Sequence, residues 1–265
     1  MATDTAAPET TTPDGSPVRA QPTRARRSLL SWFGMPIFLV ATWTLTFVWV
    51  HSRELDTIEE RVLNQHTLTE KLVEHLELVG VSTLIVIAIA IPLGIMLTRP
   101  FARRAVPVVL GLANGGQAIP SLGLMTIIVF WKGVGFWTVI IGLVAYSALP
   151  ILRNTMVGLQ QVDPSLIKAS RGMGLSNSMV LRHVELPLAI PVMIAGIRTA
   201  LVINVGTATL ATFFGAGGLG FIIFSGIGLN RTPILVTGVV MASGLALLID
   251  YLAGVAGHLL SPRGL

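Results

Sequence analysis

The chain has 265 residues, of which 52% are hydrophobic and only 12% are charged. A soluble domain has about 25% charged residues, so this chain has too few charges to cover a water-exposed surface, which argues against a water-soluble enzyme. The sequence contains no cysteine, which excludes thiol catalysis, cysteine-ligated metals and a disulfide framework. The composition therefore predicts a membrane protein.

Long apolar segments predict the number of membrane crossings. A helix needs about 20 apolar residues to cross the hydrocarbon core of a bilayer. Segments of this length with at most one charge predict six spans: Leu29–Val50, Leu78–Thr98, Ala105–Trp131, Gly133–Leu152, Leu188–Thr212 and Pro233–Leu260. The third is interrupted by Pro107, Gly115–Gly116 and Pro120, and the glycine-rich segment Phe213–Thr232 is too irregular for a plain helix.

The distribution of basic residues predicts the orientation of these spans. With the N-terminus in the cytoplasm, 12 Lys and Arg residues lie on the inner side and 5 on the outer side. Because cytoplasmic loops are enriched in basic residues, both termini are expected in the cytoplasm, at the inner membrane. The pI of about 10.4 is then explained by topology, and no nucleic-acid partner is expected.

The segments that flank the first span have distinct compositions. Residues 1–28 are rich in Ala, Thr and Pro and predict a disordered cytoplasmic tail, and residues 261–265 form a short C-terminal tail. A cleaved signal peptide is the alternative for the N-terminus, but the apolar run 29–50 exceeds the 7–15 residues of such a core. In the extracytoplasmic segment 51–77, helical spacing of apolar residues predicts one or two amphipathic surface helices, with a solvated connector as the alternative.

The longest cytoplasmic loop, residues 153–187, contains strong helix boundary signals. The dipeptide Asp163–Pro164 combines a favourable N-cap with a favourable first helical residue. Gly172 and Gly174 weaken this helix and end it, and a second short helix is expected over Asn177–Val184. Small residues leave one face of the first helix bare, which suits docking into a groove on a cytoplasmic partner. The alternative is a plain connector, which is usually shorter and more polar.

Several motifs resemble one transporter family. The stretch Lys168–Gly174, followed by Val184–Pro187, resembles the EAA loop of ABC-importer permeases. Further motifs are similar to the permeases for glycine betaine, carnitine and choline, and they occur in family order: Glu74–Leu76, Ile91–Gly94, Asn114 with Gln117–Leu122, Leu149–Thr155, Gly196–Ala200 and Gly215–Gly220. The resemblance runs from about residue 70 to 230. It implies an all-α, six-span type I ABC-importer permease, with a five-helix core over residues 78–260 and an additional N-terminal helix at 29–50.

The resemblance also implies a function and partners. The chain would be the permease subunit of an ATP-driven importer for a quaternary-amine osmoprotectant, such as glycine betaine, carnitine, choline or proline betaine. It would work by alternating access with ATPase subunits, a second identical or related permease, and an extracytoplasmic substrate-binding protein. The chain would not be an enzyme and would hold no cofactor or metal, because ATP and Mg would bind the ATPase. Alternatives are import of methionine or ergothioneine, and a stand-alone secondary carrier or channel, for which the sequence lacks paired broken repeats.

The resemblance assigns a coupling role to one group of residues in the loop. Contact with the ATPase is implied for Lys168, Ala169, Ser170, Arg171 and Gly174. Lys168 stands where the family has Glu, so one charge at this contact is reversed. We hypothesise that Lys168 pairs with an acidic residue of the ATPase.

Polar residues and breaks within the spans are candidates for the translocation path or gate, since they are tolerated at membrane depth only beside protein or water. The candidates are Asn114, Gln117, Pro120, Ser121, Arg198, Asn204, Gly217 and Gly218. Arg198 lies near mid-depth, and a path or interface role and a purely structural role remain open. Direct contact with a cationic ligand is disfavoured because Arg198 would repel it. Asp250 lies near the inner end of the last span, where it can reach the membrane interface.

Overall fold

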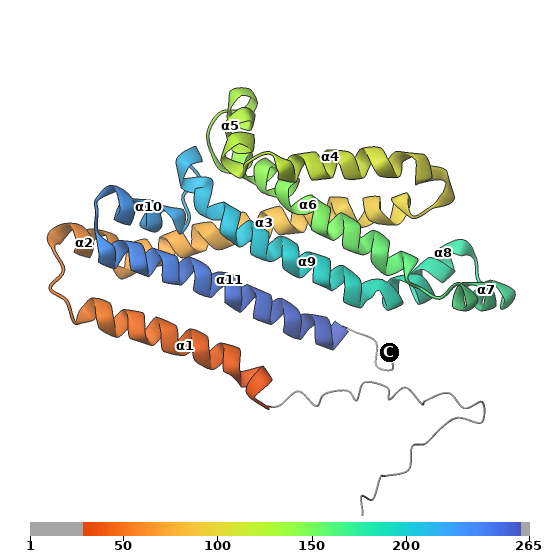
Figure 1. Ribbon diagram of the computed structural model, residues 1–265, viewed down its shortest axis with the longest axis horizontal. Helices are drawn as coiled ribbons and strands as arrows, with labels where there is room; N and C mark the ends of the chain where they lie inside the picture. The colour runs from red at the N-terminus through yellow and green to blue at the C-terminus, as the bar shows by residue number, and fades with distance from the viewer. Residues whose placement is uncertain (1–28, 261–265) are drawn as a thin grey trace, which may run out of the picture. The chain divides into compact units, whose positions relative to one another are not determined.

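The computed structural model describes residues 29–260, and every regular element in this range is helical (Figure 1). Five helices are long and apolar enough to cross a membrane, or six if one bent pair counts as a single span. This confirms the predicted all-α membrane fold. The expected tails at 1–28 and 261–265 lie outside the described residues.

The helices follow one another with short connections. Their bounds are α1 Leu29–His51, α2 Thr57–Val62, α3 Gln65–Leu97, η1 Pro100–Ala105, α4 Val106–Ala118, α5 Ser121–Lys132, α6 Phe136–Gln160, α7 Pro164–Gly172, α8 Asn177–Val180, η2 Leu181–Glu185, α9 Leu186–Ala208, η3 Thr209–Phe214, α10 Gly220–Gly228 and α11 Thr232–Leu260. The chain divides into two compact units at Gly34. Of the first unit only the residues from Leu29 are described, and the second unit begins at Met35.

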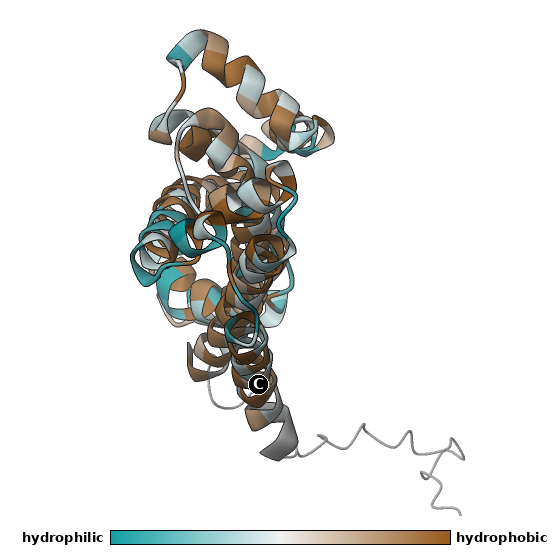
Figure 2. Cartoon of the chain, turned by 90° about the vertical axis from the view of Figure 1, so that its left-hand side faces the viewer, coloured by the Kyte–Doolittle hydropathy of each residue, from teal (hydrophilic) through white to brown (hydrophobic). Residues whose placement is uncertain are grey.

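Helices α3, α6, α9 and α11 form the packed core of this second unit. One apolar cluster joins residues of these four helices with α5 and α10, including Leu78, Val139, Val205, Ile222 and Ile234. Glycines allow close approach of α6 and α9, since a Cβ at Gly196 would lie 2.8 Å from the carbonyl oxygen of Pro150. Small residues at helix contacts are typical of membrane proteins, in which tight packing drives helix association. Figure 2 shows that the long helices are mainly hydrophobic, whereas hydrophilic residues are concentrated in turns and short helices.

The third predicted span is two helices, because the chain turns at Pro120. The run through η1 and α4 meets α5 at an angle of 103°. Ile119 has an extended ψ of 130°, and Pro120 serves as the N-cap of α5. Proline disfavours a helical conformation in the preceding residue and lacks the N–H that a continuing helix would need. The sequence located this break correctly but did not give its angle.

The segment 51–77 is organised differently from the expected surface helices. Helix α2 is short, with a complete capping box between Asp56 and Glu59. Helix α3 begins at Gln65, after the N-cap Asn64, and continues without interruption into the second span. No Gly or Pro occurs between Gln65 and Gly80, so nothing ends the helix before the apolar segment.

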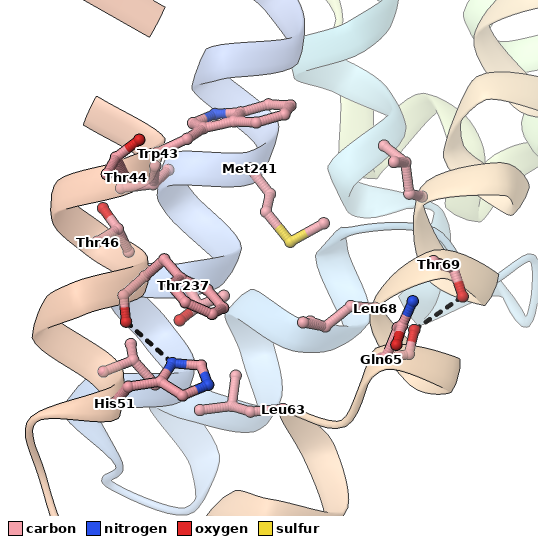
Figure 3. A pocket seen from close by; sticks show the side chains of 14 residues that line it. Trp43, Thr44, Thr46, His51, Leu63, Gln65, Leu68, Thr69, Thr237 and Met241 are labelled. Carbon is pink, nitrogen blue, oxygen red and sulfur yellow. Dashed lines mark hydrogen bonds between the residues drawn. The ribbon is translucent and has the colours of Figure 1, made fainter. Parts of the chain in front are cut away.

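Residues of α1, α3 and α11 line a cavity of about 790 Å³ (Figure 3). Its walls are mainly apolar, with Phe47, Leu68 and Met241 among the lining residues. Trp43 approaches α11 closely, since a Cβ at Gly244 would overlap its indole nitrogen. From Met35 onward, therefore, α1 lies beside the helical core and is not interleaved with it.

Candidate coupling surface and translocation path

Helix α7 has the boundaries that its sequence predicts. The Asp163 side chain accepts a hydrogen bond of 2.8 Å from the backbone N–H of Ser165, and Pro164 is the first helical residue. This N–H lowers the pKa of the exposed Asp163 carboxyl below its usual value. The helix ends at Gly172, and Gly174 has a φ of +87°, which favours glycine. Asp163 and Gly174 thus fix the two ends of the short helix.

The five predicted coupling residues do not share one environment. Lys168, Ala169, Arg171 and Gly174 are exposed. Ser170 is buried, and its hydroxyl donates to the carbonyl oxygen of Leu166 at 2.7 Å. Four of the five are therefore available to a partner, while Ser170 is turned toward the rest of the chain.

Apolar side chains are also exposed near these four residues, and the sequence did not indicate them. Leu166, Met173 and Met179 on and after α7 are exposed large hydrophobic residues. Together with Lys168 and Arg171 they form what we call the coupling surface. Their signal in the sequence was weak, because isolated apolar residues in a loop are common on protein surfaces.

The helix expected over Asn177–Val184 is not a separate element. Helix α8 passes into the π-turn η2 and then into α9, so that the helical run continues from Asn177 to Phe214. Pro187 lies at the second position of α9 and cannot donate to a carbonyl one turn earlier. A π-turn accommodates such a missing bond without ending the helix. Met179 of the coupling surface therefore lies on the same helical run as α9, whereas the other residues of that surface lie on or directly after α7.

A buried ion pair ties this region to α3. Arg99, which follows α3, directs its guanidinium at the Glu185 carboxylate, with Nη1 3.3 Å from Oε1 and Nη2 bonded to Oε2. The Glu185 side chain is only 6% exposed. This pair could not be recognised from the sequence, since the two residues are 86 positions apart.

At the other end of α3, Glu74 and His75 hold the glycine-rich loop that follows η3. Glu74 Oε2 accepts a hydrogen bond of 2.8 Å from the N–H of Gly218. His75 Nδ1 accepts from the N–H of Leu219 at 3.3 Å, and Nε2 lies 3.1 Å from the carbonyl oxygen of Val205. A neutral imidazole with its proton on Nε2 satisfies both contacts. We call these contacts the outer clamp, after the side on which the orientation predicted from the basic residues would place them.

The glycines of this loop are needed for the outer clamp. Gly217 and Gly218 have φ values of +71° and +85°. A Cβ at Gly217 would overlap the Glu74 carboxylate, and one at Gly218 would lie 3.2 Å from His75 Nδ1. The motif Glu74–Leu76 was noted for its resemblance to a family, but nothing in the sequence indicated its contact with the loop.

Arg198 and Asp250 form a paired charge within the membrane-spanning region. Arg198 Nε donates to Asp250 Oδ1 at 3.0 Å, and Nη2 donates to Oδ2 at 2.7 Å. Asp250 was expected to reach the interface, and instead it pairs with the arginine of α9. The two side chains are 39% and 35% exposed and line a cavity of about 440 Å³.

The other predicted path residues are dispersed. Asn204 is fully buried between α3 and α9, where its amide donates to Ser82 Oγ at 3.1 Å and to Thr83 Oγ1 at 3.0 Å. Gln117 links α4 to α6 by donating to the carbonyl oxygen of Tyr146 at 2.8 Å. Around the break between α4 and α5, Asn114 and Pro120 are exposed and Ser121 is partly exposed.

The family to which the chain belongs is decided by comparison with known proteins. Residues 90–263 match the family described as "Binding-protein-dependent transport system inner membrane component". The chain belongs to this family. It is therefore a multi-pass inner-membrane permease subunit of a transport system.

Individual relatives agree with this membership. The choline transport system permease protein OpuBB of Bacillus subtilis is 39% identical over 202 residues, 76% of this chain and 92% of the relative. The osmoprotectant import permease protein OsmY of Salmonella typhimurium is 40% identical over 217 residues, 82% of this chain and 90% of the relative.

A solved structure supports the fold. The inward-facing MetNI methionine ABC transporter matches with a TM-score of 0.68 and 23% identity, over 76% of this chain and all of that chain. The chain therefore has the fold of an ABC-importer permease, as the sequence motifs predicted.

Proposed function

We propose that this permease imports a small quaternary-amine osmoprotectant, of the class that includes glycine betaine, carnitine, choline and proline betaine. The observation that carries the proposal is the identity of 39–40% to relatives named for choline and osmoprotectant transport. The likeness to the methionine transporter, at 23% identity, supports the fold alone. Methionine and ergothioneine are therefore the weaker alternatives.

The energy for transport would come from partner ATPase subunits, which would also hold ATP and Mg. The coupling surface supports this, since it combines exposed Lys168 and Arg171 with exposed Leu166 and Met173. Exposed apolar residues beside cations suit an acidic groove with an apolar floor. A second permease would complete the pathway, an extracytoplasmic binding protein would deliver the ligand, and both termini would lie in the cytoplasm.

The mechanism would be alternating access. ATP binding would draw the ATPases together and move α7, and the helical run from Asn177 to Phe214 would carry this movement across the membrane. At its far end the run leads into the loop held by Glu74 and His75. A shift of α9 would therefore act on the outer clamp, which we propose as the outer gate together with Gly217 and Gly218.

Purification of the tagged chain in mild detergent, with mass spectrometry of co-purifying proteins, tests this function. An ATPase subunit should be retained by the natural chain and by Gly172→Ala, since a Cβ at Gly172 meets nothing within 4 Å. It should be lost from Gly174→Val, because the φ of +87° is strained for a β-branched residue. A chain that purifies alone and transports without ATP would show that the proposal is wrong.

The contact of Lys168 can be tested in the same complex. If Lys168 pairs with an acidic ATPase residue, Lys168→Glu should weaken retention of the ATPase and lower ATP-dependent uptake. Arg103→Glu, the same type of charge reversal at an exposed residue outside the coupling surface, serves as the control. Improved coupling in Lys168→Glu would contradict the pairing.

A further inference from the structure

The exposed ion pair between Arg198 and Asp250 needs a partner other than lipid. Arg198 lies twelve residues after the start of α9, about 18 Å along the helix at 1.5 Å per residue. A charge at such a depth is costly in hydrocarbon, so charged residues there face protein or a water-filled space. Over a third of each side chain is exposed, so the pair is accessible from a neighbouring cavity.

The space beside the pair is built by α9 and α11. The cavity of about 440 Å³ is lined, besides the two charges, by Ala195, Thr199, Val202 and Ile203. Gly254, one turn after Asp250, lies against the guanidinium, since a Cβ there would be 3.3 Å from Arg198 Cζ. These small and apolar walls leave the two charged groups as the main polar features of the cavity.

Opposite charges side by side are complementary to a zwitterion. A carboxylate bound to the guanidinium of Arg198 and a quaternary ammonium beside the carboxylate of Asp250 would replace the internal ion pair by two external ones. This exchange leaves no charge uncompensated, which is the costly outcome at low dielectric. A cation without a carboxylate could bind only Asp250 and would leave Arg198 unpaired.

We propose that Arg198 and Asp250 form a transient subsite that receives the two charged ends of a zwitterionic substrate and favours it over a simple cation. This inference rests on the proposed function. It also removes the objection that Arg198 would repel a quaternary amine, because Asp250 neutralises the arginine. The subsite would open as the substrate enters and close again behind it.

The test measures ATP-driven uptake of glycine betaine and of choline by the complete importer in proteoliposomes. The binding protein is the same for every variant, so a change in the ratio of the two uptakes arises in the permease. Arg198→Gln should shift the ratio toward choline by at least tenfold, since only the carboxylate partner is lost. Asp250→Asn should lower uptake of both substrates and shift the ratio in the opposite direction. Ser243→Ala, on the exposed side of α11, should change neither.

A variant that lacks both charges distinguishes loss of the subsite from misfolding caused by an unpaired charge. Arg198→Gln combined with Asp250→Asn removes both charges of this pair, so neither is left without its partner, and should keep normal amounts of complex. If the pair forms a substrate subsite, glycine betaine uptake by this double variant should fall at least tenfold. Near-normal uptake in this double variant, or equal losses of both substrates in the two single variants, would show that the pair only joins α9 to α11. Failure of the natural importer to take up either substrate would instead contradict the proposed function.

Discussion

Glu74 and Gly218 lie 144 positions apart and are joined by a hydrogen bond of 2.8 Å from the glycine amide to the carboxylate. This bond connects the beginning of α3 to the loop between η3 and α10. Lys71 lies 2.9 Å from Glu74 Oε1, so the carboxylate is held from both sides. The loop position consequently depends on a side chain of another helix.

Gly217→Ala should disrupt the outer clamp more than Gly215→Ala. Both residues have φ near +70°, where an L-residue costs about 1–2 kcal/mol. A Cβ at Gly217 would also overlap Glu74, whereas nothing lies within 4 Å of one at Gly215. Thermal unfolding in detergent should show a lower Tm for Gly217→Ala, and equal Tm values would contradict the contact.

His75→Phe should destabilise the folded chain by about 1–3 kcal/mol, the cost of leaving a buried backbone group without its partner. The substitution removes the contacts to the Val205 carbonyl and the Leu219 N–H. Hydrogen exchange at Leu219 should become faster. His66→Phe on the same helix is the control, since the His66 side chain is 89% exposed. If both variants behave alike, the outer clamp contributes nothing to stability.

Glu185→Gln should destabilise the region where α3 meets α9. Breaking a buried ion pair costs about 3–5 kcal/mol, and the lower end applies because Arg99 is 28% exposed. Arg99→Met combined with Glu185→Leu should recover much of the loss, since it leaves no unpaired charge. The Tm of thermal unfolding measures the stability of the single and the double variant. Arg103→Met, at an exposed residue, is the control. A double variant less stable than Glu185→Gln would contradict the reasoning.

Asp163→Ala should fray the first turn of α7, whereas Asp163→Asn should preserve it because the amide oxygen still accepts from Ser165. The pKa of Asp163 is lowered by this N–H, so the carboxylate contribution is present above the ordinary pKa of Asp. It is lost as the pH falls through the lowered pKa. Hydrogen exchange at Ser165, corrected for intrinsic rates at each pH, measures the effect. Equal protection in the Ala and Asn variants would show that the cap is unimportant.

Local signals in the sequence predicted the elements that depend on local physics. The dipeptide Asp163–Pro164 and Gly174 marked the ends of α7, and Pro120 marked the break before α5. These features follow from capping, from φ preferences and from a missing N–H, all of which act within a few residues.

Contacts between distant residues could not be predicted in the same way. Arg198 and Asp250 were each identified as unusual, but their pairing depends on how α9 and α11 pack. The contact of Glu74 with Gly218 likewise depends on tertiary structure. Asn204 was expected to face the path because it is polar, and its burial against Ser82 and Thr83 reflects the register of two packed helices.

The π-turn before α9 has a further mechanical consequence. Missing backbone bonds at Pro187 and Pro191 weaken the first turns of the helix. Beyond Pro191 the helical run continues to Phe214, about 35 Å at 1.5 Å per residue. We expect bending to concentrate at these two prolines, beside the coupling surface, and the part of the run beyond them to move as one unit. A movement of the coupling surface would then reach both faces of the membrane at the same time.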